Sequence, residues 1–181
     1  MTLSRVHSWS TGSSPKRILI DSMIVDKILE TRGLIERIQQ AGAQGVLVIV
    51  ETHVLREQLS DTPNEAKRRQ LLEVYEALPK DLVPTSAFVL DVSPLVADVS
   101  PPGGAEPADE ATAASVDRLK TPSKDSGGIK DALLAATASG KADVLVTEDT
   151  GLLKRVPVSP LRCEVWDFAR FRQFVEDTPA K

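Results

Sequence analysis

The sequence predicts an α/β fold with three layers (α/β/α), in which helices cover both faces of a mostly parallel central sheet. Two observations lead to this prediction. Short, consecutively apolar segments such as 18–20 and 46–50 alternate with longer segments of helical periodicity. Strands that are apolar at successive positions are typical of a sheet buried on both faces. Strands that alternate with helices are joined by crossovers and pair mostly in parallel.

The expected elements follow one another along most of the chain. The expected strands are, in order, 18–21, 46–50, 87–92, 143–147 and 163–166. The expected helices are, in order, 24–38, 53–60, 65–78, 109–120, one that begins at 129, 152–155 and 168–175. Gly33 is expected to break or kink the first helix, Gly42 to stop it, and Thr52 to cap the second.

Composition indicates one globular domain in the 181 residues, with 41% hydrophobic and 27% charged residues. We expect this domain at 16–176, after a flexible Ser-rich leader at 1–15 and before a short tail at 177–181. A Pro- and Gly-rich loop is expected at 99–107. The net charge of -4 and the aromatic content of 4% argue against a broad nucleic-acid binder or a base-stacking platform. They leave open a nucleic-acid enzyme whose acidic site holds metal.

The single cysteine, Cys163, excludes an intramolecular disulfide and a cysteine metal cage. It is expected to be a buried structural thiol in a reducing compartment. No apolar run approaches the length of a membrane span, and the first residues lack an apolar signal core. We therefore expect a cytoplasmic protein that has no membrane contact.

Two expected strands end in a carboxylate, and this suggests one acidic site. Asp21 ends the first strand, and Asp149 follows the fourth, in VLVTED. In open α/β sheets the ligand lies outside the carboxyl ends of the strands, where the strand order switches. If these two strands are neighbours, four acids can converge. They are Asp21, Asp149, Asp131 early in the helix that precedes the fourth strand, and Glu57 in the helix after the second.

Carboxylates that converge without a cation repel one another. A hard divalent cation relieves this repulsion, and oxygen ligands of this kind suit Mg²⁺ or Mn²⁺. Such a cation can activate water and stabilise the transition state of phosphodiester cleavage. The sequence has no cluster of histidine or cysteine that would compete for this role.

Several segments resemble, in the same order, the PIN-domain family of metal-dependent ribonucleases. They are ILIDSMIV, THVLREQL, IKDALLAATA, VLVTEDTGLL and the ending VWDFARFRQF. The resemblance spans Lys16 to Val175 and implies a three-layer fold in which the first and fourth strands lie side by side. It also implies that Thr147 lies near the site. The metal-binding and catalytic residues that it implies are Asp21, Glu57, Asp131 and Asp149.

Each acid also has an ordinary structural interpretation. Asp21 and Asp149 could cap the helices that follow them, and Asp131 could stabilise a helix dipole. Glu51, at the end of the second strand, is an alternative to Glu57. We prefer Glu57 because THVLREQL matches the family and because Glu51 is expected to be a solvated acid at a strand end.

The leading functional prediction is a Mg²⁺- or Mn²⁺-dependent endoribonuclease that acts on RNA. One alternative is a toxin of a toxin–antitoxin pair with the same chemistry, whose antitoxin partner would block the groove. Another is a non-catalytic RNA-binding or scaffold protein, against which the complete acidic set argues. The family resemblance is also compatible with a homodimer, although the sequence does not settle the oligomeric state. An aspartate-nucleophile phosphatase is disfavoured because Met23 stands where that chemistry usually has a second acid.

Overall fold

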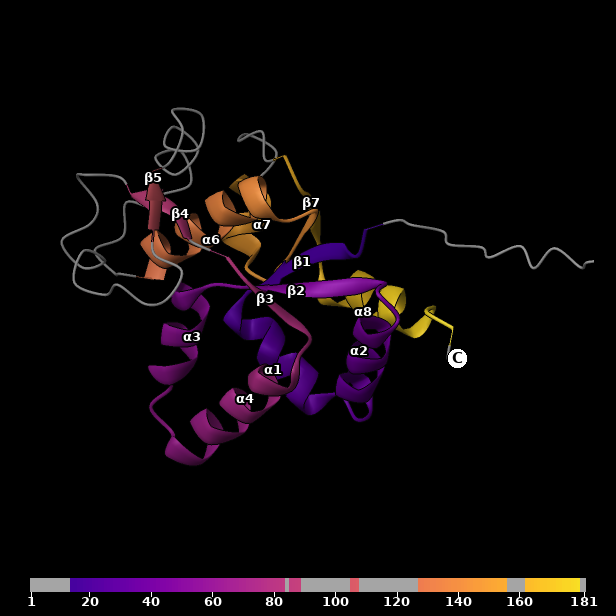
Figure 1. Ribbon diagram of the computed structural model, residues 1–181. Helices are drawn as coiled ribbons and strands as arrows, with labels where there is room; N and C mark the ends of the chain where they lie inside the picture. The colour runs from indigo at the N-terminus through magenta and orange to yellow at the C-terminus, as the bar shows by residue number, and fades with distance from the viewer. Residues whose placement is uncertain (1–13, 84, 89–104, 108–126, 156–161, 180–181) are drawn as a thin grey trace, which may run out of the picture.

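The structure, a computed structural model, describes residues 14–83, 85–88, 105–107, 127–155 and 162–179, with side chains at 14–83, 134–153 and 162–179. The central sheet has five parallel strands in the order β3-β2-β1-β6-β7 (Figure 1). These strands are β1 (Lys16–Ile20), β2 (Leu47–Glu51), β3 (Lys80–Leu82), β6 (Val144–Val146) and β7 (Glu164–Trp166). A separate parallel pair is formed by β4 (Thr85–Phe88) and β5 (Ala105–Pro107).

Helices cover both faces of the central sheet. Figure 1 shows α1, α2 and α4 on one face and α6 and α7 on the other, while α8 packs against α2. The helices are α1 (Ser22–Glu30), α2 (Leu34–Ala43), α3 (His53–Ser60), α4 (Glu65–Ala77), α6 (Gly127–Lys141), α7 (Thr150–Arg155) and α8 (Phe168–Glu176). The predicted three-layer α/β fold is therefore confirmed. Among the described residues, no helix combines the length and apolarity required to cross a membrane.

The core lies on both sides of β1 and β6. Ile18, Leu19 and Ile20 are fully buried, and so are all three residues of β6. Successive side chains of a strand point to opposite faces, so burial at every position requires cover on both faces. The consecutive apolar residues of these segments predicted this arrangement correctly.

The strand order changes direction at β1. The chain proceeds outward from β1 to β2 and β3, and then returns to place β6 and β7 on the other side of β1. Ile20 of β1 pairs with Val146 of β6, so both strands end at the same edge of the sheet. The expectation that these two strands are neighbours is confirmed. Their carboxyl ends form the switch point at which α/β sheets bind ligands.

We expected residues 87–92 to form the third strand of the central sheet, and this expectation was wrong. That place is taken by β3, in which Leu82 pairs with Glu51 of β2. The polar residues Lys80 and Asp81 are tolerated because β3 is an edge strand, where charged side chains are common. Asp81 forms an ion pair of 2.7 Å with Arg17. Residues 85–88 instead belong to β4, and 89–92 lie outside the described residues.

Other expectations are corrected or lie beyond the described part of the chain. The loop expected at 99–107 ends in strand β5, at 105–107. The helix expected at 109–120 and most of the leader, 1–13, lie outside the described residues. In the expected tail, the hydroxyl of Thr178 bonds to the carbonyl of Phe174 at 3.1 Å, and the Gln44 amide bonds to the Pro179 carbonyl at 3.1 Å.

Two glycines shape the region between β1 and β2. Gly33 has a φ of 77° and separates α1 from α2, which confirms the expected break. Gly42 does not stop the helix, because α2 continues to Ala43. A Cβ atom at Gly42 would lie 2.5 Å from Cβ of Pro79. Gly42 therefore allows the chain before β3 to pack closely on α2.

Gly42→Ala is expected to destabilise the protein, although alanine is the better helix former by about 1 kcal/mol. The contact with the rigid Pro79 ring forces the backbone apart, and overpacking of this kind costs about 1–3 kcal/mol. Urea unfolding measures the difference. The same substitution in a Pro79→Gly background should cost less, because the opposing Cβ is absent. A Gly42→Ala variant more stable than wild type would contradict the packing explanation.

Candidate functional site at the carboxyl ends of β1 and β6

Asp21 lies at the point where β1 ends and α1 begins. Its backbone N–H extends the sheet by donating to the Val146 carbonyl at 3.1 Å. Its carboxylate Oδ1 accepts the N–H of Ile24 at 3.1 Å and so caps α1. An aspartate in extended conformation before a helix favours this arrangement. The capping role considered from the sequence is therefore confirmed, and it fixes the side chain at the sheet edge.

Thr147 connects the ends of the two strands. Its side chain is completely buried, and its hydroxyl donates to Oδ2 of Asp21. The hydroxyl oxygen of Thr147 also accepts the backbone N–H of Asp149 at 3.0 Å. One hydroxyl thus joins the Asp21 carboxylate to the backbone of Asp149, across the switch between β1 and β6.

Burial disfavours the charged form of Asp21. Its exposed fraction is 8%, and loss of solvation raises the pKa of its carboxyl above the ordinary value. Hydrogen bonds from Thr147 and from nearby backbone N–H groups lower the pKa but do not reverse the shift. A nearby cation would stabilise the ionised carboxylate, so this position suits a metal ligand.

Asp149 is held in a similar way at the start of α7. Its Oδ1 accepts the N–H of Leu152 at 2.8 Å, which confirms the cap that was the alternative interpretation. A carboxylate has two oxygens and about four acceptor sites. A capping bond at Asp149 or Asp21 therefore leaves acceptor capacity for a cation, and capping does not decide against a metal-binding role.

Asp131 lies in the first half of α6, as expected. The last residue of α6, Lys141, lies at the opposite edge of the sheet, where its carbonyl accepts Nε of Arg17 at 2.8 Å. The helix packs against β1 and β6. Ten residues of helix rise about 15 Å, and the four residues from Arg17 to Asp21 rise about 13 Å along a strand. Position 131 on α6 therefore lies toward the edge of the sheet at which Asp21 lies.

The two candidates for the second acid have different surroundings. Glu57 is half-buried on α3, which packs against α1 and α6. Burial lowers the pKa of His53, and the charge of Glu57 one turn away opposes that shift only in part. Glu51 was expected to be solvated, and this was wrong. Its side chain is 16% exposed and lies 3.6 Å from Nζ of Lys80, because β3 places that lysine beside the end of β2.

Among the side chains that the structure describes, no three carboxylate, histidine or cysteine groups lie together as a metal site. Asp21, Glu57 and Asp149 therefore do not form one by themselves, and the side chain of Asp131 is outside the described set. The structure brings together Asp21, Thr147 and the backbone of Asp149. The four-acid metal site stays a prediction.

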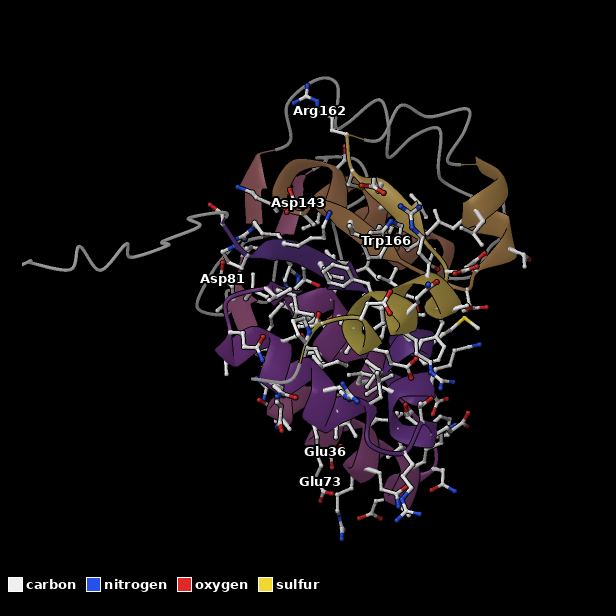
Figure 2. All side chains as sticks on the ribbon, turned by 90° about the vertical axis from the view of Figure 1, so that its right-hand side faces the viewer. Glu36, Glu73, Asp81, Asp143, Arg162 and Trp166 are labelled. Carbon is white, nitrogen blue, oxygen red and sulfur yellow. The ribbon has the colours of Figure 1, made fainter. Side chains whose placement is uncertain are left out.

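Acids at the other edge of the sheet have structural partners. Asp143 precedes β6, and its Oδ2 accepts the backbone N–H of Arg17 at 2.8 Å. Figure 2 shows Asp143 and Asp81 well apart from Glu36 and Glu73, which lie at the bottom of the view. The single cysteine, Cys163, is half-buried, and burial raises the pKa of its thiol to about 11. Cys163 is thus less buried than expected, and the raised pKa of its thiol disfavours the reactive thiolate.

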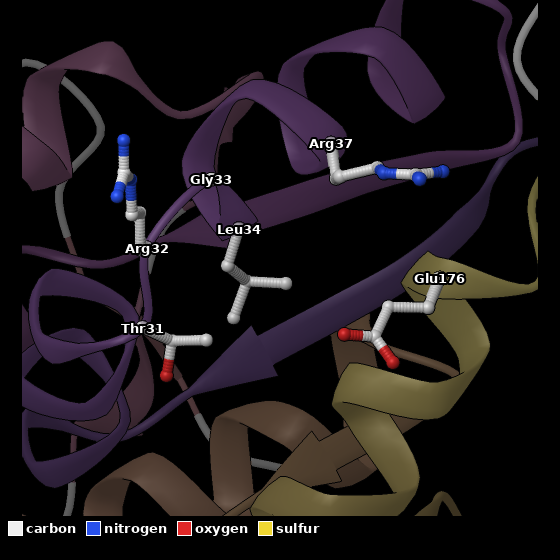
Figure 3. Close-up of a pocket in the computed structure, with 6 residues that line it drawn as sticks. All are labelled: Thr31, Arg32, Gly33, Leu34, Arg37 and Glu176. Carbon is white, nitrogen blue, oxygen red and sulfur yellow. The ribbon is translucent and has the colours of Figure 1, made fainter.

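A cavity of about 450 Å³ lies away from the switch point, between the α1–α2 turn and α8. It is lined by Thr31, Arg32, Gly33, Leu34, Arg37 and Glu176. Figure 3 shows Arg32 and Arg37 pointing away from one another, so their charges do not converge. Thr31 and Asp21 flank opposite ends of α1, about 15 Å apart along the helix axis. This cavity is separate from the candidate site.

Glu148 is a residue of interest that the sequence did not single out. It stands between Thr147 and Asp149, yet its side chain turns away to accept the N–H of Phe168 at 2.9 Å. The bridging bonds of Thr147 were also not predictable as such. The signals for them were the position of these residues in the VTED segment and the family resemblance, which implied that Thr147 lies near the site.

Searches of protein families and of curated proteins give no match to this chain. The fold is similar to a solved structure of VapBC2 from Rickettsia felis, bound to a DNA fragment from their promoter. The alignment covers 83% of this chain and 98% of that chain, at 9% sequence identity and a TM-score of 0.48. This similarity assigns neither a family nor an activity. The chain has the five-stranded parallel α/β architecture described above, and membership of the PIN-domain family stays a prediction from its sequence motifs.

Proposed function

We propose that this protein is a divalent-metal-dependent endoribonuclease whose site is built on Asp21, Glu57, Asp131 and Asp149. The observation that supports this proposal most directly is the Thr147 hydroxyl, which joins the Asp21 carboxylate to the backbone of Asp149. Both acids lie at the switch point of a parallel sheet, where ligands of α/β proteins bind. The choice of RNA as substrate rests on the motif resemblance.

The residues present fit a hard divalent cation. The candidate ligands are oxygen donors, which Mg²⁺ and Mn²⁺ prefer. Asp21 is a buried carboxyl whose pKa is raised by loss of solvation, so a cation offsets the cost of its charge. When bound, the metal supplies an activated water and stabilises the charge that develops on the phosphodiester.

The protein's own contribution is to hold the acids in place before substrate arrives. Asp21 is fixed at both oxygens, by Ile24 and by Thr147. Asp149 is fixed by its bond to the N–H of Leu152. Ligands held by such bonds lose little freedom on binding. In this proposal Asp131 and Glu57 complete the set from α6 and α3.

Cleavage is expected to depend on added metal. Purified protein should cleave a labelled single-stranded RNA with Mn²⁺ or Mg²⁺, and a chelator should stop the reaction because the carboxylates alone supply no activated water. Excess Mn²⁺ should restore it. Calorimetric titration with Mn²⁺ gives a second readout. Cleavage that persists in chelator, or an absence of Mn²⁺ binding, would contradict the proposal.

A further inference from the structure

The backbone and the side chain of Glu148 serve two different parts of the molecule. Its backbone lies between Thr147, whose hydroxyl donates to Asp21, and Asp149, whose N–H donates to that hydroxyl. Its side chain extends to the start of α8 instead. Glu148 therefore stands between the candidate site and a helix that contributes none of the four proposed acids.

Both carboxylate oxygens of Glu148 have partners. Oε1 accepts the N–H of Phe168 at 2.9 Å, one of the first N–H groups of α8, which have no partner within their own helix. Oε2 lies 3.6 Å from Nζ of Lys27, on α1. The Lys27 ammonium also lies 5.4 Å from the centre of the Phe168 ring. These contacts hold the side chain in one orientation.

The residues that follow β6 are attached to the β7–α8 junction at two points. The N–H of Thr147 donates to the Trp166 carbonyl at 3.0 Å, and Glu148 accepts from Phe168. Two attachments in successive residues restrict both translation and rotation of the peptide that links Thr147 to Glu148. Without the second attachment, the segment has more freedom to turn the Thr147 hydroxyl away from Asp21.

We propose that Glu148 is a positioning residue for the candidate metal site. By binding α8 and α1, its side chain holds the 147–149 segment so that Thr147 stays on Asp21 and Asp149 stays at the sheet edge. The effect on metal binding rests on the function proposed above, whereas the effect on the segment itself does not. Outer-shell partners of metal ligands commonly act in this way.

The test compares Glu148→Ala, Glu148→Gln and a control, Glu176→Gln. Glu176 is an exposed acid on α8 that pairs with Arg172 at 2.7 Å, away from the segment. Amide hydrogen exchange in metal-free protein should become faster at Asp149 and Phe168 in Glu148→Ala, because the segment then opens locally at a lower free-energy cost. The N–H of Arg170, bonded to Asp167 at 2.8 Å, should exchange as in wild type.

Mn²⁺ affinity should fall roughly tenfold in Glu148→Ala. Glu148→Gln keeps an oxygen acceptor for Phe168 and should restore most of the exchange protection and most of the affinity, which a loss of overall stability would not explain. Wild-type exchange at Asp149 in Glu148→Ala would overturn the proposal. If the wild type binds no Mn²⁺, the proposed function fails, and the exchange measurement alone still decides whether Glu148 holds the segment.

Discussion

Asp21→Asn is expected to abolish RNA cleavage without destabilising the protein at neutral pH. Asparagine removes the negative charge that a divalent cation requires. Changes in outer-shell partners already cost 10- to 100-fold, so loss of a direct ligand should reduce the cleavage rate by at least about a hundredfold. The rate is measured on labelled single-stranded RNA with Mn²⁺.

The stability of the same variant has a separate physical basis. Asparagine caps helices about as well as aspartate, and its carbonyl can accept from Ile24, while its amide can donate to the hydroxyl of Thr147. Because burial raises the folded-state pKa of Asp21, its contribution to stability is fully present below the ordinary value of 3.8 and is lost as pH rises through the raised pKa. The ionised group therefore costs stability at pH 7, and asparagine avoids that cost.

Urea unfolding should show Asp21→Asn to be at least as stable as wild type at pH 7, with the difference shrinking as pH falls toward 4. Asp167→Asn is the matched control. Asp167 follows β7 and caps α8 by accepting the N–H of Arg170 at 2.8 Å. Like Asp21, it caps a helix directly after a strand, but it lies outside the proposed site. It should retain activity. Full activity in both Asp21→Asn and Asp131→Asn would reject the proposed site.

Thr147→Val is expected to lower both the Mn²⁺ affinity of the site and the stability of the protein. Valine has nearly the shape of threonine but lacks the hydroxyl, so Oδ2 of Asp21 and the N–H of Asp149 both lose this partner. A buried polar group left without a partner costs about 1–3 kcal/mol. Mn²⁺ affinity and cleavage should fall about 10- to 100-fold. The pKa of Asp21 should rise further, because the Thr147 bond lowers it.

Thr147→Ser provides the control for this substitution. Serine keeps the hydroxyl and loses only a methyl group, so Mn²⁺ affinity should stay near that of wild type. Urea unfolding and Mn²⁺ titration of the two variants separate the hydroxyl from the volume of the side chain. Equal Mn²⁺ affinity in the valine and serine variants would show that the bridge does not organise the site.

The sequence by itself determined the features that depend on neighbouring residues. Consecutive apolar residues predicted β1 and β6, because only a strand covered on both faces buries every position. Asp21 and Asp149 could be placed at strand ends because the apolar runs stop there. The α6 position of Asp131 followed from helical periodicity. These local patterns were sufficient to predict a parallel sheet with acids at the ends of β1 and β6.

Only the tertiary structure decided the features that join distant parts of the chain. β3 is polar and short, and it is recognisable only through its pairing with β2. Gly42 is explained by Pro79, and the burial of Glu51 by Lys80. The bond from Thr147 to Asp21 joins residues 126 positions apart. The sequence does not show which partner a given hydroxyl or carboxylate will bind, because the packing of strands and helices determines which groups lie within hydrogen-bonding distance.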